Sequence, residues 1–215
     1  MKRKNKKGFT LIEMMLSIAI IVLISGLFAS LIWATKDTYY RTYNNNDSTD
    51  YAALYSQALE NFILRDWQMI NSLEDKKVSY CIRDADSAIV RGEGNSPTYS
   101  PIFTLEQMTN RAGDQKWRIY ITDVSFTSTN NQYLLKYTIY VIDNYTNPGT
   151  LQSSYTSSMW LPMHGNTTDM FSSQTAVSIS STGQSRTFPA GASSLGDIAG
   201  ISGTPTDQVI IMTAT

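Results

Sequence analysis

The sequence predicts an α+β protein in which one long N-terminal helix is followed by a head built on an antiparallel β-sheet. Three observations lead to this fold class. An uncharged apolar run occupies residues 14–34, and apolar residues at helical spacing continue to about residue 73. Short runs of β-branched and aromatic residues, separated by Gly, Ser and Thr, fill the remainder. A helix that precedes a succession of strands is typical of the α+β class.

The first apolar run is long enough to span a membrane. Residues 14–34 are 21 consecutive uncharged positions. A helix of that length rises about 32 Å, against about 30 Å for the core of a bilayer. Lipid offers the backbone no hydrogen-bond partner, so we expect this segment to be helical. Most flanking cations precede the run, which places the N-terminus in the cytosol and the chain beyond about residue 36 outside; they are Lys2, Arg3, Lys4, Lys6 and Lys7.

A second helical pattern follows the span. Apolar residues recur at steps of three and four from Tyr51 through Trp67 to Leu73, and we expect this stripe to pack into a core. Residues 44–47 interrupt the pattern with poor helix formers that are good N-cap residues, which favours a kink or break there. The predicted organisation is 1–8 as a basic leader, 9–35 as the apolar helix, 36–74 as an amphipathic helix with a potential kink near 44–47, and 75–215 as a β-rich head.

The strongest strand signals form a predicted hairpin. Residues 117–121 alternate, residues 133–142 are rich in Tyr, Leu, Ile and Val, and the polar link at 128–131 indicates an antiparallel turn between them. Weaker strand candidates are 78–82, 88–91, 176–180 and 209–213, and the Gly-, Ser-, Thr- and Pro-rich segments 92–101 and 183–205 are predicted loops.

The sequence offers little catalytic chemistry. His164 is the only histidine and Cys81 the only cysteine, too few ligands and nucleophiles for a zinc site or a catalytic triad. No phosphate-binding or dinucleotide-binding glycine motif is present. We therefore predict a non-enzymatic protein with no catalytic, cofactor-binding or metal-binding residue, and a surface-loop position for His164. Cys81 lies in the apolar run 78–82, which indicates a buried small hydrophobe, with cross-linking to a partner as the alternative.

Two further features concern cations and nucleic acids. Asp84 and Asp86 stand two positions apart, a spacing that can present oxygens to calcium, but the other ligands of an EF-hand loop are missing. Solvated turn acids are the expected interpretation, and calcium binding stays open.

Without its five leader cations the chain holds 12 basic residues against 18 acidic ones, which argues against a broad nucleic-acid-binding face.

The most specific signal is the segment Lys6-Lys7-Gly8-Phe9-Thr10-Leu11-Ile12-Glu13. A secretory signal is cut after its apolar region, whereas here the small residue Gly8 stands before it. The segment resembles the processing site of type IV prepilins and type II secretion pseudopilins. Those families have a basic leader, Gly before the cut, Phe after it, and Glu at the fifth position of the mature chain. All four elements are present here.

This resemblance implies a set of roles and partners. A prepilin peptidase would cut between Gly8 and Phe9 and N-methylate Phe9, and Glu13 would pair with that amine on a neighbouring subunit. The implied fold is pilin-like, with the second half of the long helix packed under the sheet. The implied partners are the peptidase, other pilin or pseudopilin subunits, and membrane lipid before assembly. The implied location is the cytoplasmic membrane, as a single-pass protein, and then a cell-surface or periplasm-spanning filament.

Three features favour a minor pilin or a larger pseudopilin over a major subunit. No proline lies between Phe9 and Ala34, Cys81 has no second cysteine with which to close a C-terminal loop, and the predicted head is large. The alternative is a signal-anchored surface protein whose β-rich head binds a ligand, and an anchored enzyme is a third hypothesis. The sequence does not separate pili, type II secretion and the DNA uptake of competence.

Overall fold

The computed structural model describes residues 11–105, 116–129, 132–145, 149–162, 177–189 and 191–214. Its first element is the helix α1, Leu11–Met69, which two short 3-10 turns follow, Ile70–Ser72 and Glu74–Lys76. The chain divides into two compact units, an N-terminal unit that ends at Asn44 and a head that comprises Asn45–Thr215.

The described part of the N-terminal unit is a single apolar stretch of α1. Leu11–Lys36 is long and apolar enough to cross a membrane, judged by length and composition. Its large side chains are exposed, as expected for a helix that requires lipid or other helices around it. Four hydroxyl groups in this part of α1 donate to backbone carbonyls three or four residues earlier: Ser17 to Glu13, Ser30 to Leu27, Thr35 to Leu31 and Thr38 to Ala34.

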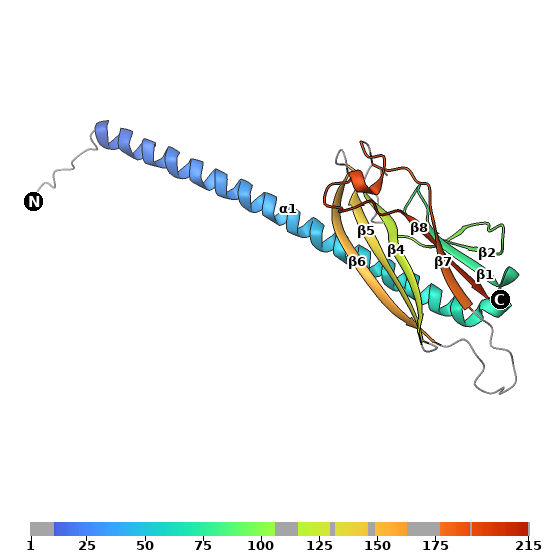
Figure 1. Cartoon of the computed structure of the whole chain (residues 1–215). Helices are drawn as coiled ribbons and strands as arrows, with labels where there is room; N and C mark the ends of the chain where they lie inside the picture. The colour runs from blue at the N-terminus through green and yellow to red at the C-terminus, as the bar shows by residue number, and fades with distance from the viewer. Residues whose placement is uncertain are drawn as a thin grey trace, which may run out of the picture. The chain divides into compact units, whose positions relative to one another are not determined.

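The head contains two antiparallel sheets (Figure 1). The larger sheet has the strand order β3-β2-β1-β8-β7, and the smaller has the order β4-β5-β6. The strands of the larger sheet are β1 Lys77–Ile82, β2 Ile89–Glu93, β3 Ser100–Phe103, β7 Val177–Gly183 and β8 Gln208–Ala214. Those of the smaller sheet are β4 Trp117–Thr129, β5 Gln132–Asp143 and β6 Thr150–Leu161.

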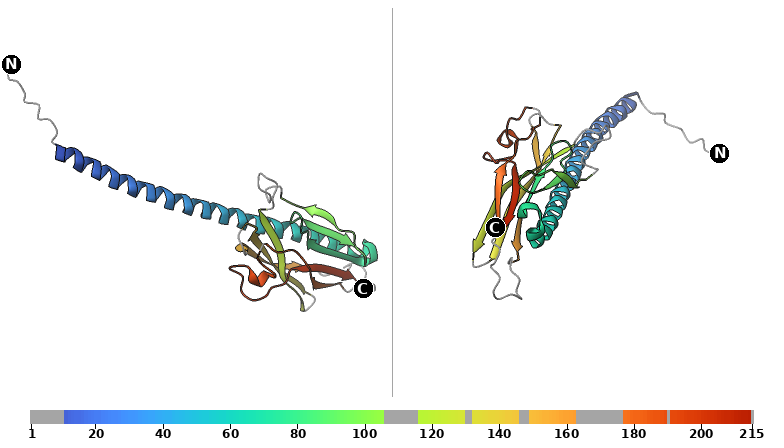
Figure 2. Two further views of the ribbon diagram at one scale, coloured as in Figure 1. Left: turned by 90° about the horizontal axis from the view of Figure 1, so that it is seen from above. Right: turned by 90° about the vertical axis from the view of Figure 1, so that its right-hand side faces the viewer.

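The main core of the head lies between the sheets and the last turns of α1. Within the head, the helix lies along the strands in the views of Figures 1 and 2. Its buried stripe follows the 3.6-residue period, so one face is removed from water and the other remains exposed. The buried residues of that stripe are Ala52, Tyr55, Leu59, Ile63 and Trp67; together with Ile70 of the following 3-10 turn they join one cluster with residues of both sheets.

A smaller apolar cluster covers part of the smaller sheet. Tyr120 and Ile142 pack there with Leu195 and Ile198, which belong to the long segment between β7 and β8. The rings of Tyr120 and Phe188 are stacked, with centroids 5.7 Å apart. This segment therefore has its own apolar anchor, although its composition predicted only a loop.

Several sequence predictions are confirmed. The α+β class is correct, and β4 and β5 pair as the predicted hairpin, with Ile121 opposite Ile139. The candidates at 78–82, 88–91 and 209–213 correspond to β1, β2 and β8, and β7 overlaps the candidate at 176–180 but continues to Gly183. The helical assignment of α1 is continuous through residues 44–47, so no break occurs there. The potential kink stays a prediction.

The sequence missed two strands. β3 falls at the end of the predicted loop 92–101, where Ser100 and Pro101 hide the strand signal. β6 carries five serines and threonines in its first eight positions, and only its last residues alternate clearly between exposed and buried. Both β3 and β6 lie at sheet edges, where one side of the strand is unpaired and strand propensity is a weak guide.

Candidate assembly residues and polar clusters of the head

The three predicted assembly residues lie at the start of the chain. Gly8 and Phe9 fall outside the described residues, and Glu13 lies in the first turn of α1 as described. The Glu13 side chain is exposed, and its backbone carbonyl accepts a hydrogen bond from Ser17 Oγ at 2.8 Å. The first turn of a helix has unpaired backbone N–H groups and favours a negative charge. This position suits a carboxylate that pairs with an amine, and that pairing stays a prediction.

A buried carboxylate connects the helix to the larger sheet. Asp66 of α1 is 1% exposed, and its carboxylate accepts hydrogen bonds from the Tyr80 hydroxyl on β1 and from the Arg91 guanidinium on β2. Arg65 Nε donates to the same group at 3.0 Å. Burial opposes the ionisation of Asp66, but these hydrogen bonds outweigh it and hold the pKa of its carboxyl below the usual value. The sequence analysis did not identify this cluster.

Two further polar contacts connect the helix to the smaller sheet. Glu60 of α1 accepts hydrogen bonds from Ser157 Oγ on β6 and, at 3.2 Å, from Ser56 Oγ. Trp67 Nε1 donates to the backbone carbonyl of Pro162 at 2.8 Å. The helix therefore has polar contacts with both sheets in addition to its apolar stripe.

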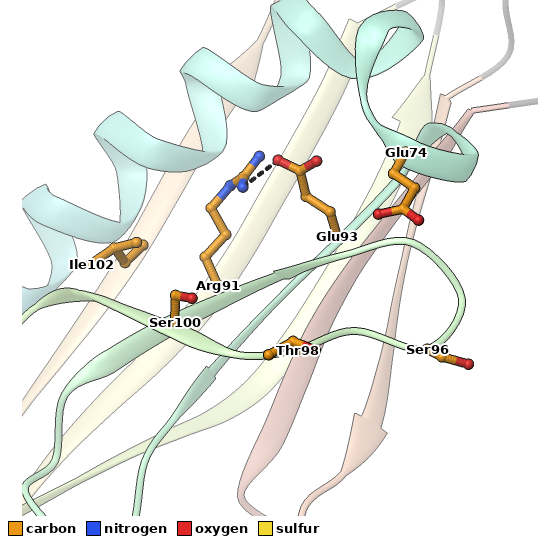
Figure 3. A pocket seen from close by; sticks show the side chains of 7 residues that line it. All are labelled: Glu74, Arg91, Glu93, Ser96, Thr98, Ser100 and Ile102. Atoms are coloured by element: carbon orange, nitrogen blue, oxygen red, sulfur yellow. Dashed lines mark ion pairs between the residues drawn. The ribbon is translucent and has the colours of Figure 1, made fainter.

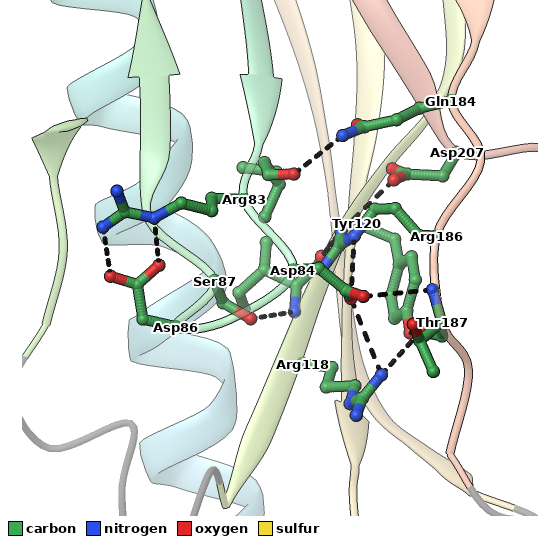
Figure 4. Close-up of polar contacts among 12 residues, drawn as sticks. Arg83, Asp84, Asp86, Ser87, Arg118, Tyr120, Gln184, Arg186, Thr187 and Asp207 are labelled. Atoms are coloured by element: carbon green, nitrogen blue, oxygen red, sulfur yellow. Dashed lines mark hydrogen bonds and ion pairs between the residues drawn. The ribbon is translucent and has the colours of Figure 1, made fainter. Parts of the chain in front are cut away.

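A second charged cluster lies beside the segment that follows β7 (Figure 4). Arg186 is almost fully buried and its Nη1 donates to the Ile119 carbonyl at 2.6 Å and to Asp207 at 3.2 Å. Its Nε lies 3.5 Å from Asp84, an ion pair rather than a short hydrogen bond. Asp207 also accepts from the Ile121 backbone N–H at 2.9 Å. Burial is the dominant influence on Asp207 and raises the pKa of its carboxyl to about 6, in spite of these partners.

The two acids that raised the question of calcium have protein partners. Asp86 is bound by the Arg83 guanidinium at 2.6 and 2.9 Å, and Asp84 accepts from the Thr187 backbone N–H at 3.2 Å. Arg118 lies 3.7 Å from Asp84. The expectation of merely solvated turn acids is therefore incomplete. Among the described residues, no group of three His, Cys, Asp or Glu side chains could hold a metal ion.

A polar hollow of about 410 Å³ lies beside β2. In Figure 3, Arg91 and Glu93 lie next to each other in it, joined by an ion pair of 2.5 Å. Glu74 and the hydroxyl groups of Ser96 and Thr98 complete its rim. The guanidinium is already neutralised by Asp66 and Glu93, so the hollow presents no uncompensated cation to an anionic ligand.

The remaining sequence predictions concern Cys81 and His164. Cys81 is buried, which confirms the prediction of a small buried hydrophobe. Burial raises the pKa of its thiol to about 11, so it is a poor nucleophile at neutral pH. His164 lies outside the described residues.

Comparison with known proteins gives one match. Residues 3–29 match the family model described as the prokaryotic N-terminal methylation motif. The match includes Gly8, Phe9 and Glu13 and extends through most of the apolar run, and it includes no residue of the head. No curated protein and no solved structure matches the chain.

Proposed function

Because this chain is a type IV pilin-like precursor, we propose that it is a structural subunit of a type IV pilus-like filament, either a minor pilin or one of the larger pseudopilins. The observation that supports this most directly is the methylation motif at residues 3–29, which leads without interruption into an apolar helix long enough to span a membrane. Families that carry the motif are structural rather than catalytic, which is consistent with a non-enzymatic role.

The first proposed step is processing of the leader. The chain inserts with its basic leader in the cytosol, in agreement with the excess of cations before the span. A prepilin peptidase cuts between Gly8 and Phe9 and N-methylates Phe9. Gly8 has no Cβ, so the backbone before the cut can enter a narrow site on the peptidase. The cut also removes the five positive charges of the leader, which would otherwise accompany the helix into a filament.

The second proposed step is assembly through α1. The apolar side chains of Leu11–Lys36 leave lipid and pack against the same segment of neighbouring subunits, so their surface stays out of water throughout. Glu13 would be costly in that environment without a partner, since an acid at the centre of a spanning helix costs about 2.5–3.5 kcal/mol and somewhat less near its end. The amine of Phe9 on a neighbouring subunit is the partner we propose.

The proposed minor role rests on the head and on the apolar run. No proline loosens the helix between Phe9 and Ala34, and the head is stabilised by its core and polar clusters with the single thiol of Cys81 buried. The head is expected on the outer side of the membrane.

The mature N-terminus tests the proposal. The protein is isolated from native membranes and from sheared surface fractions, and its N-terminal peptide is measured by mass spectrometry. We expect a chain that begins at methylated Phe9, and an intact leader after Gly8→Val. Glu13→Gln should leave the cut in place and reduce incorporation into filaments at least tenfold, whereas the surface control Asp50→Asn should change neither. A wild-type chain that still begins at Met1 would contradict the proposal and favour the signal-anchored alternative.

A further inference from the structure

The outer end of the apolar helix carries amphipathic side chains that the assembly motif does not use. Trp33 is 71% exposed and Tyr39 is 65% exposed, about 1.7 turns apart on α1. Lys36 lies between them, with its Nζ 5.5 Å from the centroid of the Trp33 ring. Tryptophan and tyrosine with an apolar body and a polar edge are the side chains enriched where a membrane meets water.

The position of these residues matches one membrane thickness. From Leu11 to Trp33 the helix rises about 33 Å, close to the hydrocarbon thickness of about 30 Å. No charged residue occurs between Glu13 and Lys36, so Lys36 is the first cation that can reach the outer headgroups. A lysine at this depth extends its methylene chain along apolar surface and keeps its ammonium in the polar layer.

The surface around Lys36 changes from apolar to polar along the helix. A shallow groove of about 660 Å³ begins at Phe28, Leu31 and Ile32 and ends at Lys36 and Tyr39. The apolar part can contact the methylene groups of an acyl chain, while the ammonium is complementary to a phosphate. The Thr35 hydroxyl in this groove already donates to the Leu31 carbonyl at 2.8 Å, so it does not require water.

We propose that Trp33, Lys36 and Tyr39 form an interfacial anchor that binds phospholipid headgroups of the outer leaflet and fixes the depth of the subunit before assembly. The inference rests on the membrane stage of the proposed function. The anchor is one-sided, because residues 2–7 supply five cations and no aromatic side chain at the other end of the span. Removal of the leader takes these five cations away from the inner end and leaves the ring and the amine of Phe9 there. After the cut, the outer anchor becomes the main determinant of depth.

Depth measurements on the full chain test this anchor. Spin labels are placed singly by Leu27→Cys, Thr35→Cys and Thr49→Cys, and the chain is studied in phosphatidylcholine vesicles and in vesicles with added phosphatidylglycerol. The native Cys81 is buried and should not compete for the label. We expect label 27 in the acyl region, label 35 near the phosphates and label 49 in water, in both kinds of vesicle, because both lipids carry the phosphate.

The anchor is then removed by the combined variant Trp33→Ala, Lys36→Gln and Tyr39→Ala. We expect label 35 to shift by about one helical turn, roughly 5 Å. Leu23→Ala is the control, since it removes an exposed apolar side chain of the same helix that does not line the groove, and it should leave the depth unchanged. An unchanged depth in the combined variant, or an equal shift in the control, would overturn the anchor. The anchor would also be overturned if the label at position 35 were as accessible to water as the label at position 49.

These outcomes are distinguishable from failure of the proposed function. A mature chain that begins at Phe9 but shows no depth change on loss of the three side chains would retain the filament subunit and exclude the anchor. A chain with an intact leader and the expected depth shift would retain the anchor in an ordinary signal-anchored protein.

Discussion

Removing the buried charge of Asp66 is the most informative single perturbation of the head. The Asp66 side chain is 2% exposed and its main cationic partner, Arg91, is 16% exposed. In Asp66→Asn one oxygen still accepts a hydrogen bond, but the new amide group faces the donors of Arg91 and Tyr80. A guanidinium that is mostly buried then retains only Glu93 as an anionic partner.

The expected cost follows from this geometry. Breaking a buried ion pair from one side typically costs about 3–5 kcal/mol. The partial exposure of Arg91 and its second pair with Glu93 place the value near the lower limit, at about 3 kcal/mol. For a unit the size of the head, that loss lowers the midpoint of thermal unfolding by roughly 6–12 °C. Arg65 adds little, because its side chain is half exposed.

The assay is unfolding of the full chain in non-ionic detergent micelles. Urea unfolding is followed by tryptophan fluorescence, since Trp67 and Trp117 are buried in the core of the head. Asp50→Asn is the matched control, an exposed acid on the same helix, and it should stay within about 0.5 kcal/mol of wild type. The double variant with Arg91→Met should show a coupling of at least about 1 kcal/mol. Strict additivity, or an Asp66→Asn variant as stable as the control, would refute this account of the cluster.

Three further predictions concern other buried positions. Burial raises the pKa of Asp207 from 3.8 to about 6, so the folded head binds a proton that the unfolded chain releases. The stabilising contribution of this proton should therefore be lost as pH rises from about 4 to about 7, by on the order of 3 kcal/mol, and stability should fall less steeply over that range in Asp207→Asn. Urea titrations that give the same pH dependence for both proteins would contradict this prediction. Cys81 should resist thiol reagents at pH 8 until the head is unfolded, and modification of the native protein at the rate of an exposed thiol would show that it is not buried. Gly92→Ala would place a Cβ 2.5 Å from Pro97 Cβ, and we expect a loss of about 1–3 kcal/mol in urea unfolding; a variant as stable as wild type would mean that the β2–β3 loop moves freely.

The elements with a strong period could be predicted from the sequence. The apolar stripe that includes Tyr55, Leu59 and Trp67 is the face of α1 that enters the core, as its spacing indicated. The β4–β5 hairpin was predictable because both strands are long, apolar and joined by a polar turn. These signals are local, so neighbouring residues alone are enough to produce them.

The strand β6 could have been predicted from its neighbour β5. β5 has buried residues on both faces, with Leu135, Tyr137 and Ile139 on one face and Thr138 on the other. A strand of that kind is usually central, which requires a partner on each side. The hairpin supplied only β4, so a further strand was required close by, and the alternation of Ser157, Met159 and Leu161 marks it.

The polar contacts of α1 could not be predicted, and they have a mechanical consequence for the proposed function. Asp66 follows an arginine and precedes a buried tryptophan, so its local sequence does not reveal that Arg91, 25 positions away, is its partner. The same holds for Glu60 and Ser157, which are 97 positions apart. In a filament, the apolar part of α1 would be held by other subunits while external forces act on the head. The helix must then stay attached to both sheets. Apolar contacts are non-directional, so they resist sliding of the helix along the strands less well than hydrogen bonds of defined direction. Asp66 bonds to the larger sheet and Glu60 to the smaller one. In single-molecule pulling, a variant that lacks both carboxylates should therefore let the helix separate from the strands at a lower force than wild type, and an unchanged force would contradict this role.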